Sequence, residues 1–169
     1  MPTATESVVN LVSGVSADVF GVVGFIILLT ALGLSKGKDN LIVMMLSIYP
    51  AALITEHFPY YDSMSLGSGT LANVLGPLLI FIIVTVTSFF IFKNYIDTNY
   101  QHHSFWRFVE VIILAIANIG LFITVLYHIV GIESFYNFSF VFDSLFTSNL
   151  AMLFWLVLPI ISIPLFIRA

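Results

Sequence analysis

The chain has 169 residues, of which 60% are hydrophobic and 8% are charged, and its formal net charge is −4. This composition excludes an ordinary soluble domain, because a protein of this size still exposes a large share of its surface to water. The chain has no basic block, which disfavours nucleic acid as a partner, and it has no cysteine for a disulfide or a thiolate metal site. A lipid bilayer is therefore its expected solvent.

Five stretches are apolar enough to cross a membrane as helices, each of which needs about 20 residues. In chain order we predict spans at residues 18–35, 41–55, 74–92, 105–131 and 150–167. The fold class is therefore all-α, a polytopic transmembrane helical bundle, with residues 1–169 forming a single integral membrane domain. The second stretch is short and contains Pro50, so it is either a kinked span or a re-entrant segment.

The cations predict how the chain is oriented. Lys36 and Lys38 lie between the first two spans, Lys93 and Arg107 flank the connection between the third and fourth, and Arg168 follows the fifth. Alternating spans place all five cations on one side of the membrane. Because Lys and Arg concentrate in cytoplasmic loops, we predict an outside N-terminus and a cytoplasmic C-terminus. The N-terminus lacks the basic region of a cleavable signal peptide and is expected to stay in the mature chain.

The first two predicted spans are joined by the short polar sequence "SKGKDN", residues 35–40. A turn of this length predicts a tight helical hairpin. Gly37 can adopt the left-handed conformation that ends one helix, and Asp39 or Asn40 can cap the next.

The first predicted span carries a seam of small residues at spacings of three and four. The helix-packing seam consists of Gly14, Ala17, Gly21, Gly24 and Ala31. Small residues let helix backbones approach closely in lipid, so this seam predicts packing within the bundle or self-association of two chains.

The fourth predicted span carries most of the polar residues that could have a functional role. This polar stripe consists of Arg107, Glu110, Asn118, Thr124 and His128, and all except the adjacent Asn118 share one helix face. Arg107 and Glu110 are one turn apart, which predicts a local ion pair at the cytoplasmic interface. Asn118 lies near the middle of the membrane and is expected to donate a hydrogen bond to another helix. The other interpretation of the stripe is a proton or ion pathway.

No motif in the sequence indicates catalysis or a bound cofactor. The combination of Glu56, His57 and His128 could in principle hold a metal ion, but its spacing matches no metal-binding pattern. We therefore predict a protein that is not an enzyme and has no catalytic residues, cofactor or metal site.

The order of these features resembles the colicin V production protein (CvpA) family of small multi-pass bacterial inner-membrane proteins. Ser35-Lys36-Gly37-Lys38 corresponds to that family's basic turn after the first span, and residues 107–120 correspond to the start of its glycine-containing fourth span. The sequence "FPY" after the second span, residues 58–60, and the Leu- and Pro-rich last span also resemble those of uncharacterised small multi-pass membrane proteins of candidate-phylum bacteria. Both resemblances imply a location in the bacterial cell inner membrane and an accessory role in export or envelope processes.

These observations lead to two hypotheses of function. The first is a non-enzymatic accessory or scaffold subunit of a bacterial envelope or export process. Its expected partners are the lipid bilayer and either another protein or further copies of the chain. The second is a small oligomeric transporter or channel that uses the polar stripe.

Overall fold

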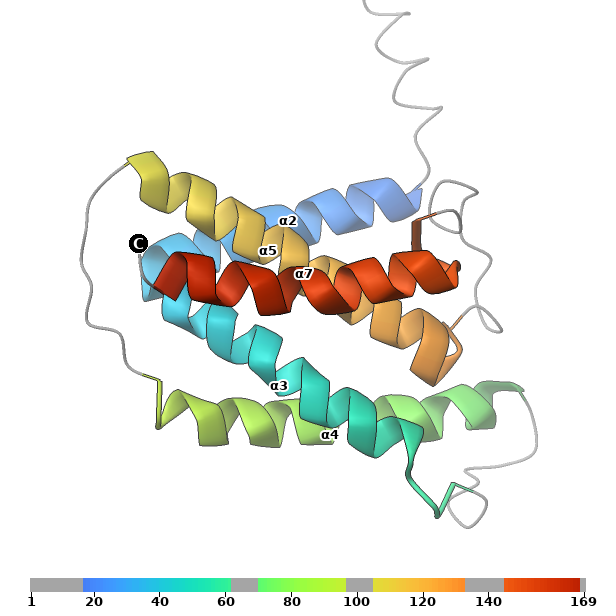
Figure 1. Ribbon diagram of the computed structural model, residues 1–169. Helices are drawn as coiled ribbons and strands as arrows, with labels where there is room; N and C mark the ends of the chain where they lie inside the picture. Colours follow the sequence, from blue (N-terminus) through green and yellow to red (C-terminus); the bar gives the residue numbers. More distant parts are fainter. Residues whose placement is uncertain (1–16, 62–69, 97–104, 133–144, 168–169) are drawn as a thin grey trace, which may run out of the picture.

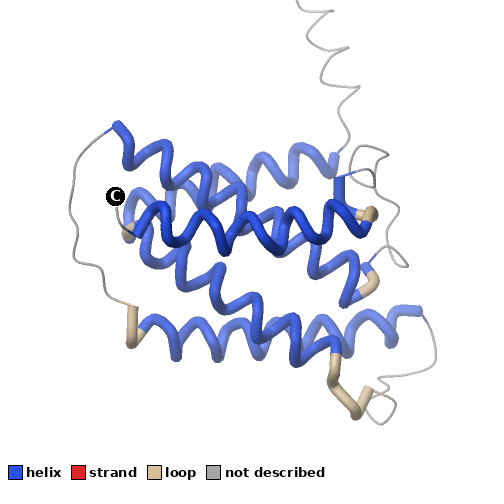
Figure 2. The backbone as a smooth tube through the Cα atoms, viewed as in Figure 1, coloured by secondary structure: helices blue, strands red, loops and turns tan. Residues whose placement is uncertain are grey.

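The computed structural model describes residues 17–61, 70–96, 105–132 and 145–167. Its helices are α2 (Ala17–Lys36), α3 (Lys38–Glu56), α4 (Thr70–Lys93), α5 (Phe105–Val125) and α7 (Asn149–Ile167), with a π-helical turn η2 (Leu126–Val130) continuing α5 (Figure 1). The described ranges contain no strand (Figure 2). The prediction of an all-helical protein is confirmed.

Four of these helices are long and apolar enough to cross a membrane, namely α2, α3, α4 and α5 continued by η2. The lengths and composition of these helices are therefore those of a multi-pass membrane protein. In α7 the apolar stretch Asn149–Leu165 is shorter than in the other four. That α7 also crosses the bilayer stays a prediction.

Helix α3 contains Pro50 in its interior. It runs without interruption through Pro50 for 19 residues, which corresponds to about 28 Å at 1.5 Å per residue. A proline inside a helix removes one backbone hydrogen bond, a loss that packed transmembrane helices tolerate. The helix begins at Lys38, three residues before the predicted start, so the polar residues of the turn belong to its first turn.

The turn between α2 and α3 differs from the prediction. Gly37 has φ 96° and ψ 150°, a positive φ that favours glycine, but its ψ lies outside the left-handed helical region. Gly37 is itself the N-cap of α3, and no side chain caps that helix, so the expected cap at Asp39 or Asn40 is wrong. Instead, the Asn40 side-chain amide donates to the Lys36 carbonyl at 2.7 Å and so satisfies the end of α2.

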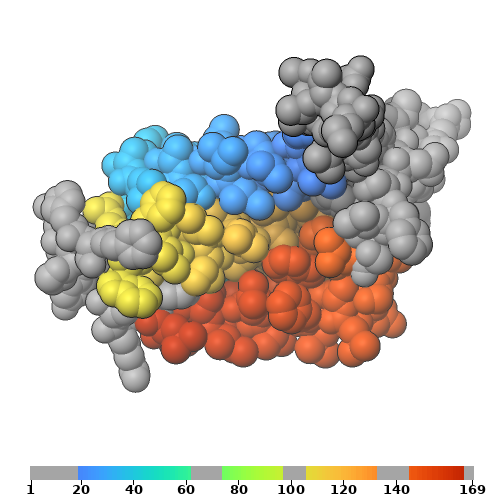
Figure 3. All heavy atoms as spheres, turned by 90° about the horizontal axis from the view of Figure 1, so that it is seen from above, coloured from blue at the N-terminus to red at the C-terminus, as the bar shows by residue number. Residues whose placement is uncertain are grey.

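Successive helices run in alternating directions, so α2, α4 and α7 end where α3 and α5 begin (Figure 1). Helix α5 is central: it packs against α2, α3 and α7, whereas α4 packs mainly against α3. Viewed from above, α5 lies between α2 and α7 (Figure 3). Among the four longest spans α5 is the most buried and α2 the least.

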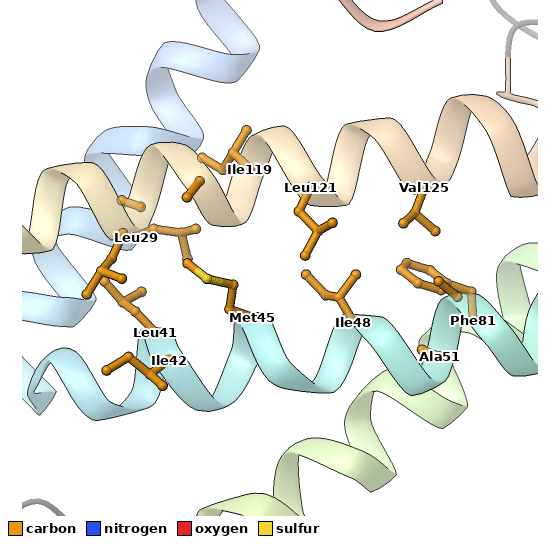
Figure 4. Close-up of a cluster of buried hydrophobic side chains, with 14 of the residues drawn as sticks. Leu29, Leu41, Ile42, Met45, Ile48, Ala51, Phe81, Ile119, Leu121 and Val125 are labelled. Carbon is orange, nitrogen blue, oxygen red and sulfur yellow. The ribbon is translucent and has the colours of Figure 1, made fainter. Parts of the chain in front are cut away.

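The core is formed chiefly where α3 and α5 face one another. Figure 4 shows Met45 and Ile48 of α3 pointing toward Leu121 and Val125 of α5, with Phe81 of α4 closing the cluster. Met45, Ile48, Phe81 and Leu121 are fully buried. The middle of α5 is therefore enclosed by apolar side chains from its neighbours.

Candidate functional site

The described cations gather at one end of the bundle, which we call the basic end. Lys36 is the last residue of α2, Lys38 the first of α3, Lys93 the last of α4, and Arg107 the third of α5. The alternating helices bring these four positions to the same end (Figure 1). Arg168 lies outside the described residues. The fold thus confirms that these four cations share a side, while the face of the membrane they occupy stays a prediction.

Glu110 forms its ion pair with a different residue from the one predicted. Its Oε2 accepts from Lys38 Nζ at 3.0 Å, and the two side chains are 13% and 17% exposed. The expected Arg107–Glu110 pair is wrong. Proximity along one helix favoured Arg107, but Lys38 at the start of α3 reaches Glu110 from the neighbouring helix. The ion pair therefore joins two helices and is largely shielded from solvent.

Arg107 instead contacts the end of α2. Its Nη2 donates to the Leu34 carbonyl at 3.3 Å. Carbonyls in the last turn of a helix have no partner within that helix, and a cation there interacts favourably with the helix dipole. Arg107 and Glu110 thus bind separately to α2 and α3, and together they fix the hairpin of these two helices against the start of α5.

Asn118 confirms the prediction of an interhelical hydrogen bond. It is 1% exposed, and its Nδ2 donates to the Leu41 carbonyl of α3 at 2.8 Å. Its Oδ1 is buried and has no hydrogen-bond partner among the described residues. A buried amide oxygen without a partner costs free energy, so this residue combines one interhelical bond with one unsatisfied acceptor.

The remaining polar residues of the stripe bond to their own helix. Thr124 Oγ1 donates to the Gly120 carbonyl at 2.8 Å, and the His128 Nδ1 lies 3.3 Å from the Thr124 carbonyl oxygen. The face between Glu110 and Thr124 is filled by apolar residues with no exposed surface, Leu114, Ala117 and Leu121. The described stripe is therefore a set of separate polar contacts within an apolar core.

The helix-packing seam on α2 has a different environment from the one predicted. Gly21, Gly24 and Ala31 are exposed, and a Cβ added at Gly21 or Gly24 would meet no described residue within 4 Å. The prediction that these two glycines pack within the bundle is therefore wrong for the described residues. This face of α2 points away from α5. Gly14 lies outside the described residues, as does the side chain of Ala17. Self-association through the seam stays a prediction.

Two other glycines form the close helix contacts that the seam was expected to provide. A Cβ at Gly33 would lie 2.6 Å from Leu41 Cδ1 and 2.7 Å from Val111 Cγ1, so α2, α3 and α5 meet there. A Cβ at Gly120 would overlap the ring of Trp155, which packs on the α5 backbone from α7. Gly33 is spaced four residues from Gly37, and Gly120 four residues from Thr124, which is the spacing of small residues at close helix contacts. What distinguishes Gly33 and Gly120 from Gly21 and Gly24 is that side chains of neighbouring helices face them.

The end of the bundle opposite the basic end carries aromatic side chains after α3. The Tyr61 hydroxyl donates to the Thr55 carbonyl at 2.6 Å, and its ring centroid lies 5.2 Å from that of Phe58. Burial raises the pKa of Tyr61 above its ordinary value. The hydrogen bond from Tyr61 to Thr55 holds residues 58–61 against the last turn of α3.

The histidines and acidic residues do not converge in the described part of the chain. There, no group of three His, Asp or Glu side chains is placed to hold a metal ion. Glu56, His57 and His128 therefore do not form such a group. His57 Nδ1 lies 3.1 Å from the Leu53 carbonyl oxygen of its own helix. The ring nitrogens of His57 and His128 therefore lie near backbone carbonyls of the preceding helical turn.

Comparisons with models of known protein families, with curated proteins and with solved structures found no match. The resemblance to the CvpA family stays a prediction.

Proposed function

We propose that this protein is a non-enzymatic accessory or scaffold subunit of a membrane assembly, located in the bacterial cell inner membrane and serving an envelope or export process. The observation that carries the proposal is the use of the α5 polar groups. Glu110 is paired with Lys38, and Asn118 is bonded to the Leu41 carbonyl, so both link α5 to α3. Polar groups bonded in this way stabilise a helical bundle without providing a route through it.

The apolar filling between these contacts supports the same proposal. A path for protons or ions needs a chain of polar groups or water within hydrogen-bonding reach. Leu114 and Leu121 lie on the same face between the polar residues and are fully buried. The polar groups on α5 are consequently separated from one another by side chains that cannot transfer a proton.

The location rests on composition and on the arrangement of charge. Large apolar side chains remain exposed along α2 and α4, among them Phe25, Ile83 and Phe90. Such surface is stable only against lipid or another apolar partner. The cations at one end fit the positive-inside rule with the basic end in the cytoplasm.

One observation favours the second hypothesis, a transporter or channel. Asn118 Oδ1 is an acceptor without a partner deep inside the bundle, and the Oγ1 of Thr30 on α2 is also buried without a partner. Polar residues inside transmembrane segments are a feature of substrate and proton pathways. A transport function would require these two groups to face a solvated passage in another conformation.

The stoichiometry of the purified complex tests the proposal. The protein, carrying an affinity tag, is extracted from its native membrane in a mild detergent, and the masses of the intact complexes are measured. A scaffold is expected to retain a second protein at a fixed integer ratio through gel filtration. Recovery only as the chain alone or as its homo-oligomer would contradict the accessory role and favour transport.

A further inference from the structure

The four described cations differ in what neutralises them. Lys38 is paired with Glu110 at 3.0 Å, and Lys93 Nζ lies 5.8 Å from the centre of the Phe89 ring. Lys36 is exposed, and Arg107 donates one hydrogen bond, to a neutral carbonyl. Within the described ranges neither Lys36 nor Arg107 forms a salt bridge with a carboxylate. Neither charge is therefore neutralised by a salt bridge there, although Asp39 lies three residues from Lys36.

These two cations occupy the same corner of the basic end. Arg107 Nη2 lies 3.3 Å from the carbonyl oxygen of Leu34, and Leu34 and Lys36 both belong to the last turn of α2. Figure 3 shows the start of α5 beside the end of α2. A guanidinium has five N–H donors in a planar fork, and this one uses a single donor toward the described residues. The rest of the fork is available to an anion.

Aromatic residues place this corner at the membrane surface. Trp106, next to Arg107, is 72% exposed, and Tyr95, just beyond α4 at the same end, is 84% exposed. Exposed Trp and Tyr side chains at the ends of transmembrane helices lie at the level of the lipid headgroups. The corner between α2 and α5 is thus at the depth where lipid phosphates are found.

We propose that Lys36 and Arg107 bind the phosphate of an anionic phospholipid at the corner between α2 and α5. The guanidinium binds two phosphate oxygens side by side, and the Lys36 ammonium supplies a second charge. Basic sites between helices are a known means of recognising anionic headgroups. The proposal depends on the position of the protein in a membrane and is independent of the scaffold hypothesis.

Native mass spectrometry of the purified protein in a neutral detergent tests the site. The probes are phosphatidylglycerol and phosphatidylcholine with the same acyl chains. We expect phosphatidylglycerol to remain bound at lower concentration than phosphatidylcholine. Lys36→Gln and Arg107→Gln should each weaken phosphatidylglycerol binding about fivefold, and the double variant about 25-fold. Lys36→Arg keeps the charge and should bind within about twofold of the wild type.

Lys93→Gln is the matched control, because it removes one charge from the same end but from α4, which packs mainly against α3. If it weakens binding as much as Lys36→Gln, the effect is one of total charge and the site is wrong. Equal binding of the two lipids would also overturn the proposal. Displacement of phosphatidylglycerol by low millimolar inorganic phosphate would show a site for a soluble anion. Should Arg107→Gln fail to fold, Lys36→Gln decides the outcome, since the Lys36 side chain is exposed and forms no salt bridge with the described residues.

Discussion

Lys38 and Glu110 are 72 residues apart in the chain, yet Lys38 Nζ lies 3.0 Å from Glu110 Oε2. The pair joins the first residue of α3 to the second turn of α5, at the end of the bundle where the cations gather. It fixes the position of the α2–α3 hairpin on the central helix. The free energy that this ion pair contributes to folding therefore measures how strongly α3 and α5 are joined at the basic end.

Removing either partner is expected to lower thermal stability in detergent by different amounts. Lys38→Met leaves a mostly buried carboxylate without its cation and should cost about 1.5–3 kcal/mol. Glu110→Gln keeps an acceptor for Lys38 and should cost about 1 kcal/mol. The double variant should show a coupling above about 0.5 kcal/mol. Lys93→Met is the control, and equal losses at Lys38 and Lys93 would show that the pair contributes nothing specific.

Asn118 provides a second test, because its two polar atoms have different environments. Asn118→Leu removes one hydrogen bond and one unsatisfied acceptor together, so the stability should change by less than about 1 kcal/mol. Asn118→Asp loses the donor and introduces a charge near the middle of the span, which should cost about 2.5–3.5 kcal/mol. Melting temperatures of both variants check this. A strongly destabilised Asn118→Leu protein would show that the unsatisfied acceptor does not offset the hydrogen bond to Leu41.

Substitution by alanine should destabilise the protein at Gly33 and Gly120 and be tolerated at Gly21 and Gly24. Gly120→Ala forces α7 away from α5 because the Trp155 ring occupies the space, and it should cost about 1–3 kcal/mol. Gly33→Ala meets Leu41 Cδ1 at 2.6 Å and Val111 Cγ1 at 2.7 Å, both in buried side chains, and should also be destabilising. Gly21→Ala and Gly24→Ala meet no described residue and should be neutral or stabilising, since alanine favours helix. Loss of a dimer in the Gly21 or Gly24 variant would instead identify the seam as an intermolecular contact.

The sequence was sufficient to predict the helices and the common side of the described cations. Long apolar runs specify helices in lipid whatever their neighbours, because each helix satisfies its own backbone. Which face packs inward was not predictable for α2, since lipid accepts Gly21 and Gly24 as readily as a packed interior does. The partner of Glu110 was missed for a related reason: Arg107 is nearer in sequence, and only the approach of α3 brings Lys38 closer. Gly120 matters because Trp155 faces it, which no pattern in the sequence shows.

The orientation in the membrane can be measured with single cysteines, because the chain has none. Ser35 is exposed at the basic end, and a cysteine there avoids the positive φ of Gly37. Tyr60, at the opposite end, is 62% exposed and is the second position for a cysteine. With the basic end in the cytoplasm, an impermeant maleimide added to intact cells should label Cys at position 60 and leave position 35 unlabelled. The reverse pattern would show an inverted orientation.

The central claim is that the polar groups of α5 hold helices together and do not form a path across the membrane. Proton flux into liposomes containing only this protein, measured with an internal pH-sensitive dye under an imposed pH gradient, tests it most directly. The account predicts that wild-type, Glu110→Gln and Asn118→Leu vesicles dissipate the gradient no faster than protein-free vesicles. A wild-type flux that Asn118→Leu or Glu110→Gln abolishes while the variant remains folded would contradict it.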